Sequence, residues 1–181
     1  SAHAGLHIIY EPLNRRPDTA CDRFFSPDKQ ETDDYGRSRT PLLSLETQTP
    51  LFEFPLIGFA VSFEMDYFHV LDILAAGKVK LLAAERGERD PLVIAGGPCA
   101  TFNPEPLSRF VDALIIGEGE AIMPRFMDVY YAARAEGLPR AAMLRDPMVS
   151  AYMKNAFLAV HPDDRAKVEK AFHEGFGASY F

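Results

Sequence analysis

The stretch "PLVIAGGPCATFNPEPL", residues 91–107, decides the fold class of this chain. It joins an apolar run to a glycine pair, Gly96 and Gly97, and then to prolines of the kind that begin helices. A continuously apolar run, without alternation, is typical of a parallel strand that helices cover on both faces. Asn103 and Pro104 predict the N-cap and first residue of a short helix that ends near Phe110.

Two further apolar runs flank this stretch, "PLIGFAVS" at residues 55–62 and "DALIIGEGE" at residues 112–120. Each run precedes a segment with helical periodicity, and Gly77 is placed to end the first of these helices. The apolar faces expected for the two helices are Tyr67, Val70, Leu71 and Leu74, and Ile122, Phe126, Val129 and Tyr130. Pro124 falls near the first turn of the second helix. Backbone N–H groups there have no intrahelical partner, so the proline need not break the helix. The order predicts a doubly wound α/β fold, whose ligands bind at the carboxyl ends of the strands.

The remaining segments are less regular. Apolar residues at helical spacing predict a helix over residues 4–15, ending before Pro17. Residues 26–40 are polar and predict either a loop or a solvent-exposed helix, and residues 42–45 predict a short strand. A last helix is expected within residues 161–177.

Composition limits the classes of protein to which the chain can belong. With 181 residues, 48% of them hydrophobic and 25% charged, it suits one globular domain with an appendage. The net charge of −7 disfavours sequence-independent nucleic-acid binding, which needs clustered cations. No apolar run reaches the roughly 18 residues that span a bilayer, and no leader pattern is present, so a cytoplasmic location is expected. Two separated cysteines suggest neither zinc nor a redox pair.

Small residues end all three apolar runs: Ser62, the pair Gly96 and Gly97, and then Gly117 and Gly119. On one edge of a parallel sheet they would leave a slot where a ligand approaches the backbone closely. The alternative is that tight strand-to-helix turns require small residues without any ligand.

Other chemistry-bearing residues favour structural roles. Glu118 and Glu120 would oppose a phosphate at the "GEGE" turn, so a neutral polar ligand suits it better. Cys99 has no histidine near it in sequence to activate it. Asp66 is interpreted as a helix cap, and the pair His3 and His7 as solvent-facing. We therefore predict no catalytic residue and no metal ligand.

Residues 81–124, "LLAAERGERDPLVIAGGPCATFNPEPLSRFVDALIIGEGEAIMP", form a linked set of motifs. They resemble the N-terminal cobalamin-binding-like domain of radical S-adenosylmethionine (SAM) proteins. "GFAVSFEMDYFHVLDIL" and "SAHAGLHIIYEPLN" resemble other segments of the same family. The resemblance implies a flavodoxin-like sheet of order 2-1-3-4-5 over residues 1–137, followed by a helical C-terminal extension over residues 138–181.

The resemblance also implies a function, a cobalamin-binding module of a radical SAM enzyme. The nucleotide tail of cobalamin would thread between strands and helices at the carboxyl edge. The positions carried over as cofactor-binding are Ser62, Phe63, Glu64, Gly96, Gly97, Pro98, Gly117, Glu118 and Gly119. The parent protein would use SAM and a [4Fe-4S] cluster in an adjoining barrel, and this chain would bind neither because it lacks CxxxCxxC.

The sequence departs from the family pattern in two ways. Glu64 stands where the family has leucine, and the chain begins at the helix that follows the family's first strand. Because of the first departure, an alternative function remains, that of a cofactor-free domain with the same fold that docks onto the barrel. The second predicts an unpaired strand edge, so that the chain is marginally stable, associates with itself or recruits another segment.

Overall fold

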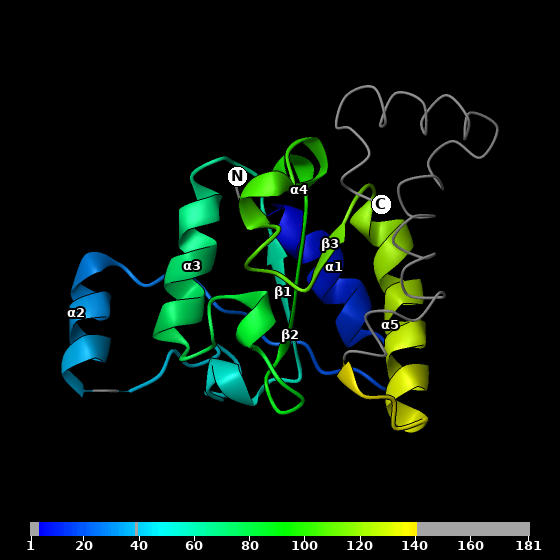
Figure 1. Cartoon of the computed structure of the whole chain (residues 1–181), viewed down its shortest axis with the longest axis horizontal. Coiled ribbons are helices and arrows are strands. Elements are labelled where there is room, and N and C mark those ends of the chain that lie inside the picture. Colours follow the sequence, from blue (N-terminus) through cyan, green and yellow to red (C-terminus); the bar gives the residue numbers. More distant parts are fainter. Residues whose placement is uncertain (1–3, 39, 141–181) are drawn as a thin grey trace.

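The computed structural model describes residues 4–38 and 40–140, which form one parallel sheet with helices on both of its faces (Figure 1). The strands are β1 (Leu56–Ala60), β2 (Leu92–Gly96) and β3 (Ala113–Ile115). The α-helices are α1 (Ala4–Asn14), α2 (Lys29–Ser38), α3 (Asp66–Ala76), α4 (Pro98–Phe102) and α5 (Gly119–Ala135). Short 3-10 helices are η1 (Leu51–Glu53), η2 (Ala83–Glu85) and η3 (Glu105–Leu107).

The strands lie in the order β1-β2-β3, and both pairs are parallel. Leu56 pairs with Leu92, and Ile94 pairs with Ala113. Neighbours in sequence are therefore neighbours in the sheet, as in the 3-4-5 part of a flavodoxin-like order. The predicted α/β class is confirmed, and all three predicted apolar runs form its strands.

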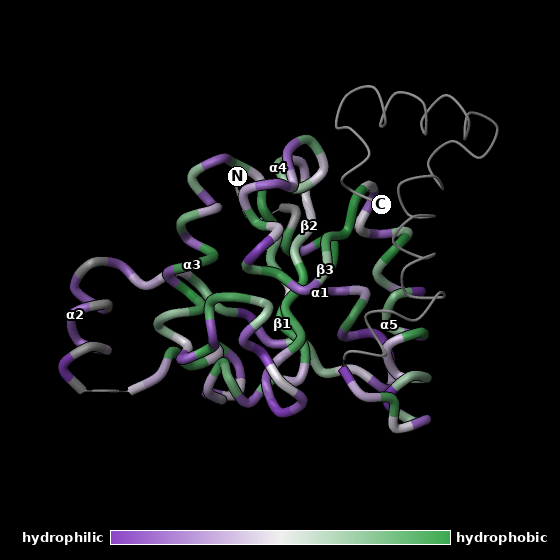
Figure 2. The backbone as a smooth tube through the Cα atoms, viewed as in Figure 1, coloured by the Kyte–Doolittle hydropathy of each residue, from purple (hydrophilic) through white to green (hydrophobic). Residues whose placement is uncertain are grey.

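The strand β2 is buried on both faces, which explains its unbroken apolar sequence. Leu92 and Ile94 pack with α1 and α5 on one face, and Val93 and Ala95 pack with α3 and its surroundings on the other. Figure 2 shows hydrophobic residues along the strands, whereas much of α2 is hydrophilic. Each of the first four residues of β2 thus contributes to one of two cores, and burial of apolar area on both faces holds the helices to the sheet.

The predicted helices of both cores are confirmed. The helix α1 ends at Asn14, before Pro17, and α5 continues through Pro124. The helix α3 ends at Gly77, but the backbone of Gly77 is not left-handed (φ −79°). A Cβ there would lie 2.3 Å from Cδ2 of Leu51, so the close approach of η1 excludes a side chain. Glycine is needed at this position for packing, and not for the turn.

The end of α5 forms a regular helix stop. Gly137 is left-handed (φ 68°) and donates its N–H to the carbonyl of Arg134, while Leu138 donates to Ala133. This pair of bonds is the Schellman arrangement that closes a helix C-terminus. The polar segment 26–40 contains the exposed helix α2, one of the two alternatives predicted for it. The predicted helix within residues 161–177 lies outside the described residues.

Two predictions about local structure are wrong. Residues 42–45 form no strand, and Leu43 makes an isolated bridge with Pro50. Asn103 does not begin a helix; it ends α4, which starts at Pro98 after Gly97, and Pro104 begins the separate turn η3. The proline that follows Asn103 prevents α4 from continuing, since it disfavours the α conformation at the residue before it.

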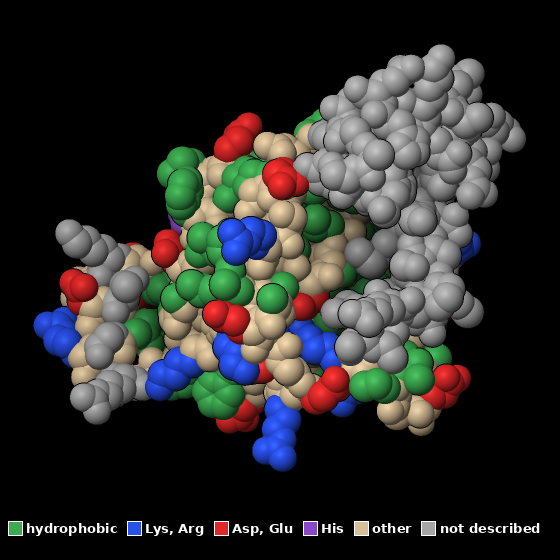
Figure 3. All heavy atoms as spheres, in the orientation of Figure 1, with side chains coloured by type: hydrophobic (Ala, Val, Ile, Leu, Met, Phe, Trp, Pro, Cys, Tyr) green, Lys and Arg blue, Asp and Glu red, His purple; other side chains and the backbone are tan. Residues whose placement is uncertain are grey.

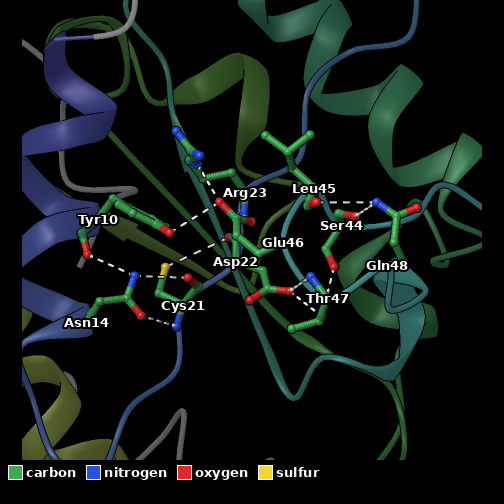
Figure 4. A network of polar contacts seen from close by, with 10 residues as sticks. All are labelled: Tyr10, Asn14, Cys21, Asp22, Arg23, Ser44, Leu45, Glu46, Thr47 and Gln48. Carbon is green, nitrogen blue, oxygen red and sulfur yellow. Dashed lines mark hydrogen bonds and ion pairs between the residues drawn. The ribbon is translucent and has the colours of Figure 1, made fainter.

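Side chains of the 44–49 loop explain why the predicted strand is absent (Figure 4). The buried Ser44 hydroxyl accepts the N–H of Thr49, and the Gln48 amide donates to the carbonyl of Ser44. Gln48 is left-handed (φ 55°), which closes the loop. Such side-chain-to-backbone bonds compete with strand pairing.

The same loop is fastened to the segment after α1. Glu46 accepts the N–H of Arg23 at 2.7 Å and its guanidinium Nε at 2.6 Å. The Tyr10 hydroxyl of α1 donates to Glu46 at 3.2 Å, and the Arg23 guanidinium lies 4.8 Å from the Tyr10 ring centre. Figure 4 shows these side chains converging from α1 and two separate loops. The network thus connects α1, the segment that follows α1 and the 44–49 loop.

A buried cluster of charges lies at the amino end of β3. The side chain of Asp112 is 3% exposed, that of Arg86 0% and that of Arg140 11%. Asp112 accepts from Arg86 Nε and from the N–H of Val93, and it pairs with Arg140. Burial lowers the pKa of Arg86, although the charge of Asp112 opposes this effect. One carboxylate thus joins β2, β3 and the segment after α5.

None of the helices in the described part of the chain is both long and apolar enough to cross a membrane.

Candidate functional site

The carboxyl ends of the three parallel strands meet at one edge of the sheet, which we call the carboxyl edge. Its turns follow Ala60 of β1, Gly96 of β2 and Ile115 of β3. All nine residues predicted to bind a cofactor lie in or beside these turns. The structure therefore brings the predicted residues to one edge, and the geometry of each turn decides what space they leave.

The turn after β1 is organised by Asp66. Its Oδ2 accepts the N–H of Ser62 and that of Phe63, both at 2.9 Å. Burial would raise the pKa of Asp66, but the two N–H donors and His69 outweigh it and hold that pKa below its usual range. Asp66 therefore does not cap α3 as expected. It is the first residue of α3, and its carboxylate instead binds the backbone N–H groups of the preceding turn. Glu64 is exposed.

The turn after β2 lies directly against the turn after β1. Gly97 has φ 102° and ψ 177°, a conformation that only glycine adopts readily. A Cβ on Gly97 would lie 2.7 Å from the carbonyl oxygen of Val61, which also accepts the N–H of Cys99 at 3.2 Å. A Cβ on Gly96 would lie 3.2 Å from Cβ of Ile115. The space beside both glycines is filled by the backbone and side chains of neighbouring strands.

The turn after β3 is similarly closed. Gly117 has φ 113° and donates its N–H to the Thr101 hydroxyl of α4 at 3.3 Å. Gly119 begins α5, and a Cβ there would lie 2.9 Å from Cδ1 of Ile9 on α1. Glu118 and Glu120 are exposed. Three of the predicted glycines therefore allow parts of the chain to approach one another, and Ile9 occupies the place beside Gly119.

Tyr67 connects α3 to α4 across this edge, a contact that the sequence did not reveal. Its hydroxyl lies 2.9 Å from the carbonyl oxygen of Asn103 and 3.2 Å from that of Cys99, and it donates to them. Burial raises the pKa of Tyr67, and the nearby Cys99 and Glu64 raise it further. The sequence pattern had placed Tyr67 only on the apolar face of its helix. No signal in the sequence specifies which carbonyl groups a tyrosine hydroxyl will reach.

Large apolar side chains project into solvent at the carboxyl edge. Phe63 is 58% exposed, Met65 64%, Phe68 62% and Phe102 79%. The first three lie in the turn after β1 and at the start of α3, and the Tyr67 contacts bring the end of α4 beside them. Figure 3 shows hydrophobic side chains over the upper parts of α3 and α4, with acidic side chains among them. We call these four residues the carboxyl-edge patch.

The thiols are not activated. Burial raises the pKa of Cys99, and the carboxylates of Glu64 and Asp66 raise it further, so it remains a neutral thiol. Burial and the neighbouring carboxylates raise the pKa of Cys21 to about 11. His7 is exposed on α1, and His3 lies outside the described residues.

The residues of this chain do not fit an iron-sulfur cluster of the radical SAM type, which takes three cysteines from a CxxxCxxC motif. The sequence holds two cysteines, and they pack against different cores. Within residues 4–38 and 40–140, no group of three or more His, Cys, Asp or Glu residues could hold a metal ion.

Comparison with known proteins identifies the family. The family described as "Radical SAM proteins, N-terminal" matches residues 5–153, most of the chain. No curated protein and no solved structure matches the chain significantly. The matched range includes all three strands, the carboxyl edge and Arg140 of the buried charge cluster. The chain therefore belongs to the family of N-terminal domains of radical SAM proteins.

Proposed function

We propose that this domain is a docking module, which binds the catalytic domain of a radical SAM protein through the carboxyl-edge patch. The observation that carries the proposal is the exposure of Phe63, Met65, Phe68 and Phe102 at one edge of the sheet. Soluble proteins expose single apolar residues everywhere, but a group of large ones at one edge is typical of an interaction site. Aromatic residues and methionine are also enriched in protein interfaces.

The family supplies the partner. The match to N-terminal domains of radical SAM proteins supports the inference that the catalytic domain is the partner, and an exposed apolar patch is the surface that such an association would bury. The patch also rests on a rigid base, because Asp66 fixes the turn that carries Phe63 and Tyr67 fixes the end of α4 that carries Phe102. A fixed surface loses little conformational entropy on binding, which favours affinity.

Substitutions on the patch test this proposal. The chain is titrated with the catalytic domain of a radical SAM protein that carries an N-terminal domain of this family. Phe102→Ser and Phe68→Ser each remove an exposed ring from the patch, and we expect each to weaken binding by about tenfold or more, as truncation of an aromatic anchor does. Phe52→Ser is the matched control, because Phe52 is also exposed but lies in η1. Equal affinities for all three variants and the parent chain would overturn the proposal.

Cobalamin binding at the same edge is the second candidate. The turns after the three strands support it, two of them containing glycine, since they meet where α/β sheets bind ligands. The residues proposed to line the cofactor are Ser62, Phe63, Glu64, Gly96, Gly97, Pro98, Gly117, Glu118 and Gly119. The filled space beside Gly97 and Gly119 weighs against it, because the nucleotide tail would have to displace Val61 or Ile9. We therefore rank it below docking.

A spectrum separates the two candidates. The chain is mixed with hydroxocobalamin, desalted and examined for corrin absorption. Absorption that stays with the protein would support cobalamin binding, and its loss would leave docking as the proposed function. Gly97→Leu is unsuitable as the negative variant, because its Cβ would meet the Val61 carbonyl and disturb the turn itself.

We also propose that the domain ends near Gly137 and that residues 138–181 form an extension. The Schellman stop after α5 supports this boundary, whereas the buried pair of Arg140 with Asp112 and the family match to residue 153 weigh against it.

A further inference from the structure

Charge is distributed unevenly between the two ends of the sheet. The lysine and arginine residues of residues 55–121, which include all three strands and their turns, are Lys78, Lys80, Arg86, Arg89 and Arg109. All of them lie in the segments that lead into the amino ends of β2 and β3. The segments beyond the carboxyl ends, residues 61–69, 97–106 and 116–121, contain neither lysine nor arginine.

The segments of the carboxyl edge carry carboxylates instead: Glu64, Asp66, Glu105, Glu118 and Glu120. Glu64 and Glu118 are exposed, and the histidine of these segments, His69, lies 3.4 Å from the carboxylate of Asp66. The carboxylates act on a neighbouring thiol, because burial raises the pKa of Cys99 and the charges of Glu64 and Asp66 raise it further. The carboxyl edge is therefore a region of negative electrostatic potential.

Carboxylates flank the carboxyl-edge patch on two sides. Glu64 lies in the turn after β1, between two members of the patch in the chain. The N–H of Gly117 donates to the Thr101 hydroxyl at 3.3 Å and so joins the turn after β3 to α4. Glu118 therefore lies close to the helix end that carries Phe102. An apolar centre with a polar, solvent-exposed rim is the usual arrangement of a protein interface.

We propose that the partner surface that receives the carboxyl-edge patch is basic, with lysine or arginine side chains around an apolar centre. The inference rests on the proposed docking function and names the chemistry of its partner. An apolar patch alone selects few partners, whereas opposite charges around the contact speed encounter and disfavour partners of like charge. The carboxylates also repel nucleic acid and anionic lipid, so a protein surface is the occupant that fits this edge.

Association kinetics test the charge of the partner. The full chain is bound to the catalytic domain of a radical SAM protein that carries an N-terminal domain of this family, and surface plasmon resonance measures both rate constants. Raising the salt concentration from about 50 mM to about 500 mM should slow association about tenfold, because salt screens the charges. Glu64→Lys and Glu118→Lys should each slow association at least about threefold at the lower salt concentration, with little change in dissociation. At the higher concentration they should match the parent chain.

Two further variants separate local charge from net charge and from apolar contact. Glu85→Lys is the matched control, because Glu85 is exposed in η2, in the segment that leads into β2, and the change in net charge is the same. It should associate as the parent chain does. Phe102→Ser should speed dissociation instead, because loss of an interface contact acts mainly on that rate. Circular dichroism melts show whether each variant is folded, and Glu64→Gln, which keeps the shape of the side chain, should slow association less than Glu64→Lys.

The results distinguish failure of this inference from failure of the docking function. Association of the parent chain that does not depend on salt, or equal slowing by Glu64→Lys and Glu85→Lys, would overturn the basic partner. Docking through the patch would survive that result if Phe102→Ser speeds dissociation in the same experiment. A Phe102→Ser variant that dissociates as the parent does, or a catalytic domain that does not bind the chain, would overturn the docking function and this inference with it.

Discussion

Gly97 holds two turns of the carboxyl edge together. Its φ of 102° turns the chain from β2 into α4, and the backbone of Val61 lies where a side chain would be. Glycine is therefore required twice at this position, for its conformation and for its contact. Either requirement alone would produce the same residue in the sequence.

Comparing alanine at Gly97 with alanine at Gly137 separates the conformational requirement from the contact requirement. We expect Gly97→Ala to destabilise the fold by about 1–3 kcal/mol for the backbone conformation, and by more because the Val61 carbonyl must move. Gly137→Ala is the matched control, since Gly137 is also left-handed (φ 68°) but has nothing within 4 Å of its Cβ position. Urea denaturation measures both free energies of unfolding. Equal losses would mean that the contact with Val61 contributes nothing.

Asp66 makes stability depend on pH. Its pKa is lower in the folded chain than in the unfolded one, so its contribution is present above the ordinary aspartate pKa. That contribution is lost as the pH falls through the lowered folded value. We expect Asp66→Asn to cost about 1 kcal/mol at pH 7, and the difference from the parent chain to shrink below about pH 4.

Free energies of unfolding at pH 7, 5 and 3 measure this difference. Asp72→Asn, at an exposed residue of the same helix, is the control and should change stability little. A difference for Asp66→Asn that stays constant over this range would contradict the assigned role of its carboxylate.

Residue identity alone predicted where these residues would lie, and not what they would contact. The position of Asp66 before an apolar helix suggested a cap, but its carboxylate accepts the N–H groups of the preceding turn instead. A short acidic side chain can reach donors on either side of a helix start, and the choice depends on the turn conformation. Tyr67 illustrates the same limit, because its partners are carbonyl groups more than thirty residues away.

Among the elements, the strands and their helices followed from apolar periodicity. The unbroken apolar run of β2 predicted burial on both faces. The structure explains the run, because the two faces of β2 meet two separate cores. The segment 42–45 misled because its apolar residues resemble a strand, while the Ser44 hydroxyl accepts the N–H of Thr49 and the Gln48 amide donates to the carbonyl of Ser44. Local hydrogen bonding of this kind overrides a weak apolar pattern.

The buried charge cluster is the element-scale contact most open to a mutational test. We expect Asp112→Ala to destabilise the fold by about 3–5 kcal/mol, because the guanidinium groups of Arg86 and Arg140 then lose their shared carboxylate. Asp128→Ala removes the exposed pair with Arg16 and should cost at most about 1 kcal/mol. Thermal and urea unfolding of both variants give the comparison. Similar losses for the two would show that burial of the cluster adds nothing to its strength.

At the scale of the whole molecule, the two ends of the sheet differ in character. The amino end is closed by the charge cluster around Asp112, which also holds the segment after α5. The carboxyl end carries the exposed apolar patch on turns that are fixed by internal hydrogen bonds. A domain closed at one end and apolar at the other is suited to covering another domain with its carboxyl edge.

The sequence predicted the location of this edge but not its surface. The glycine-containing turns indicated where the strands would end, and their resemblance to a cofactor site suggested an open slot. Whether such a slot is open depends on distant residues, Ile9 among them, whose side chain lies beside Gly119. The exposure of Phe102 could not be predicted either, because its helix was placed several residues too late.

Hydroxyl-radical footprinting tests the docking proposal most directly, because it reads the side chains of the patch themselves. Oxidation of Met65 and Phe102 is measured by mass spectrometry for the chain alone and for the chain mixed with the radical SAM catalytic domain. We predict that oxidation of both falls severalfold in the mixture, while that of Phe52 in η1 stays the same. Unchanged oxidation of Met65 and Phe102 in a mixture that forms a complex would contradict the proposal that the carboxyl edge is the docking surface.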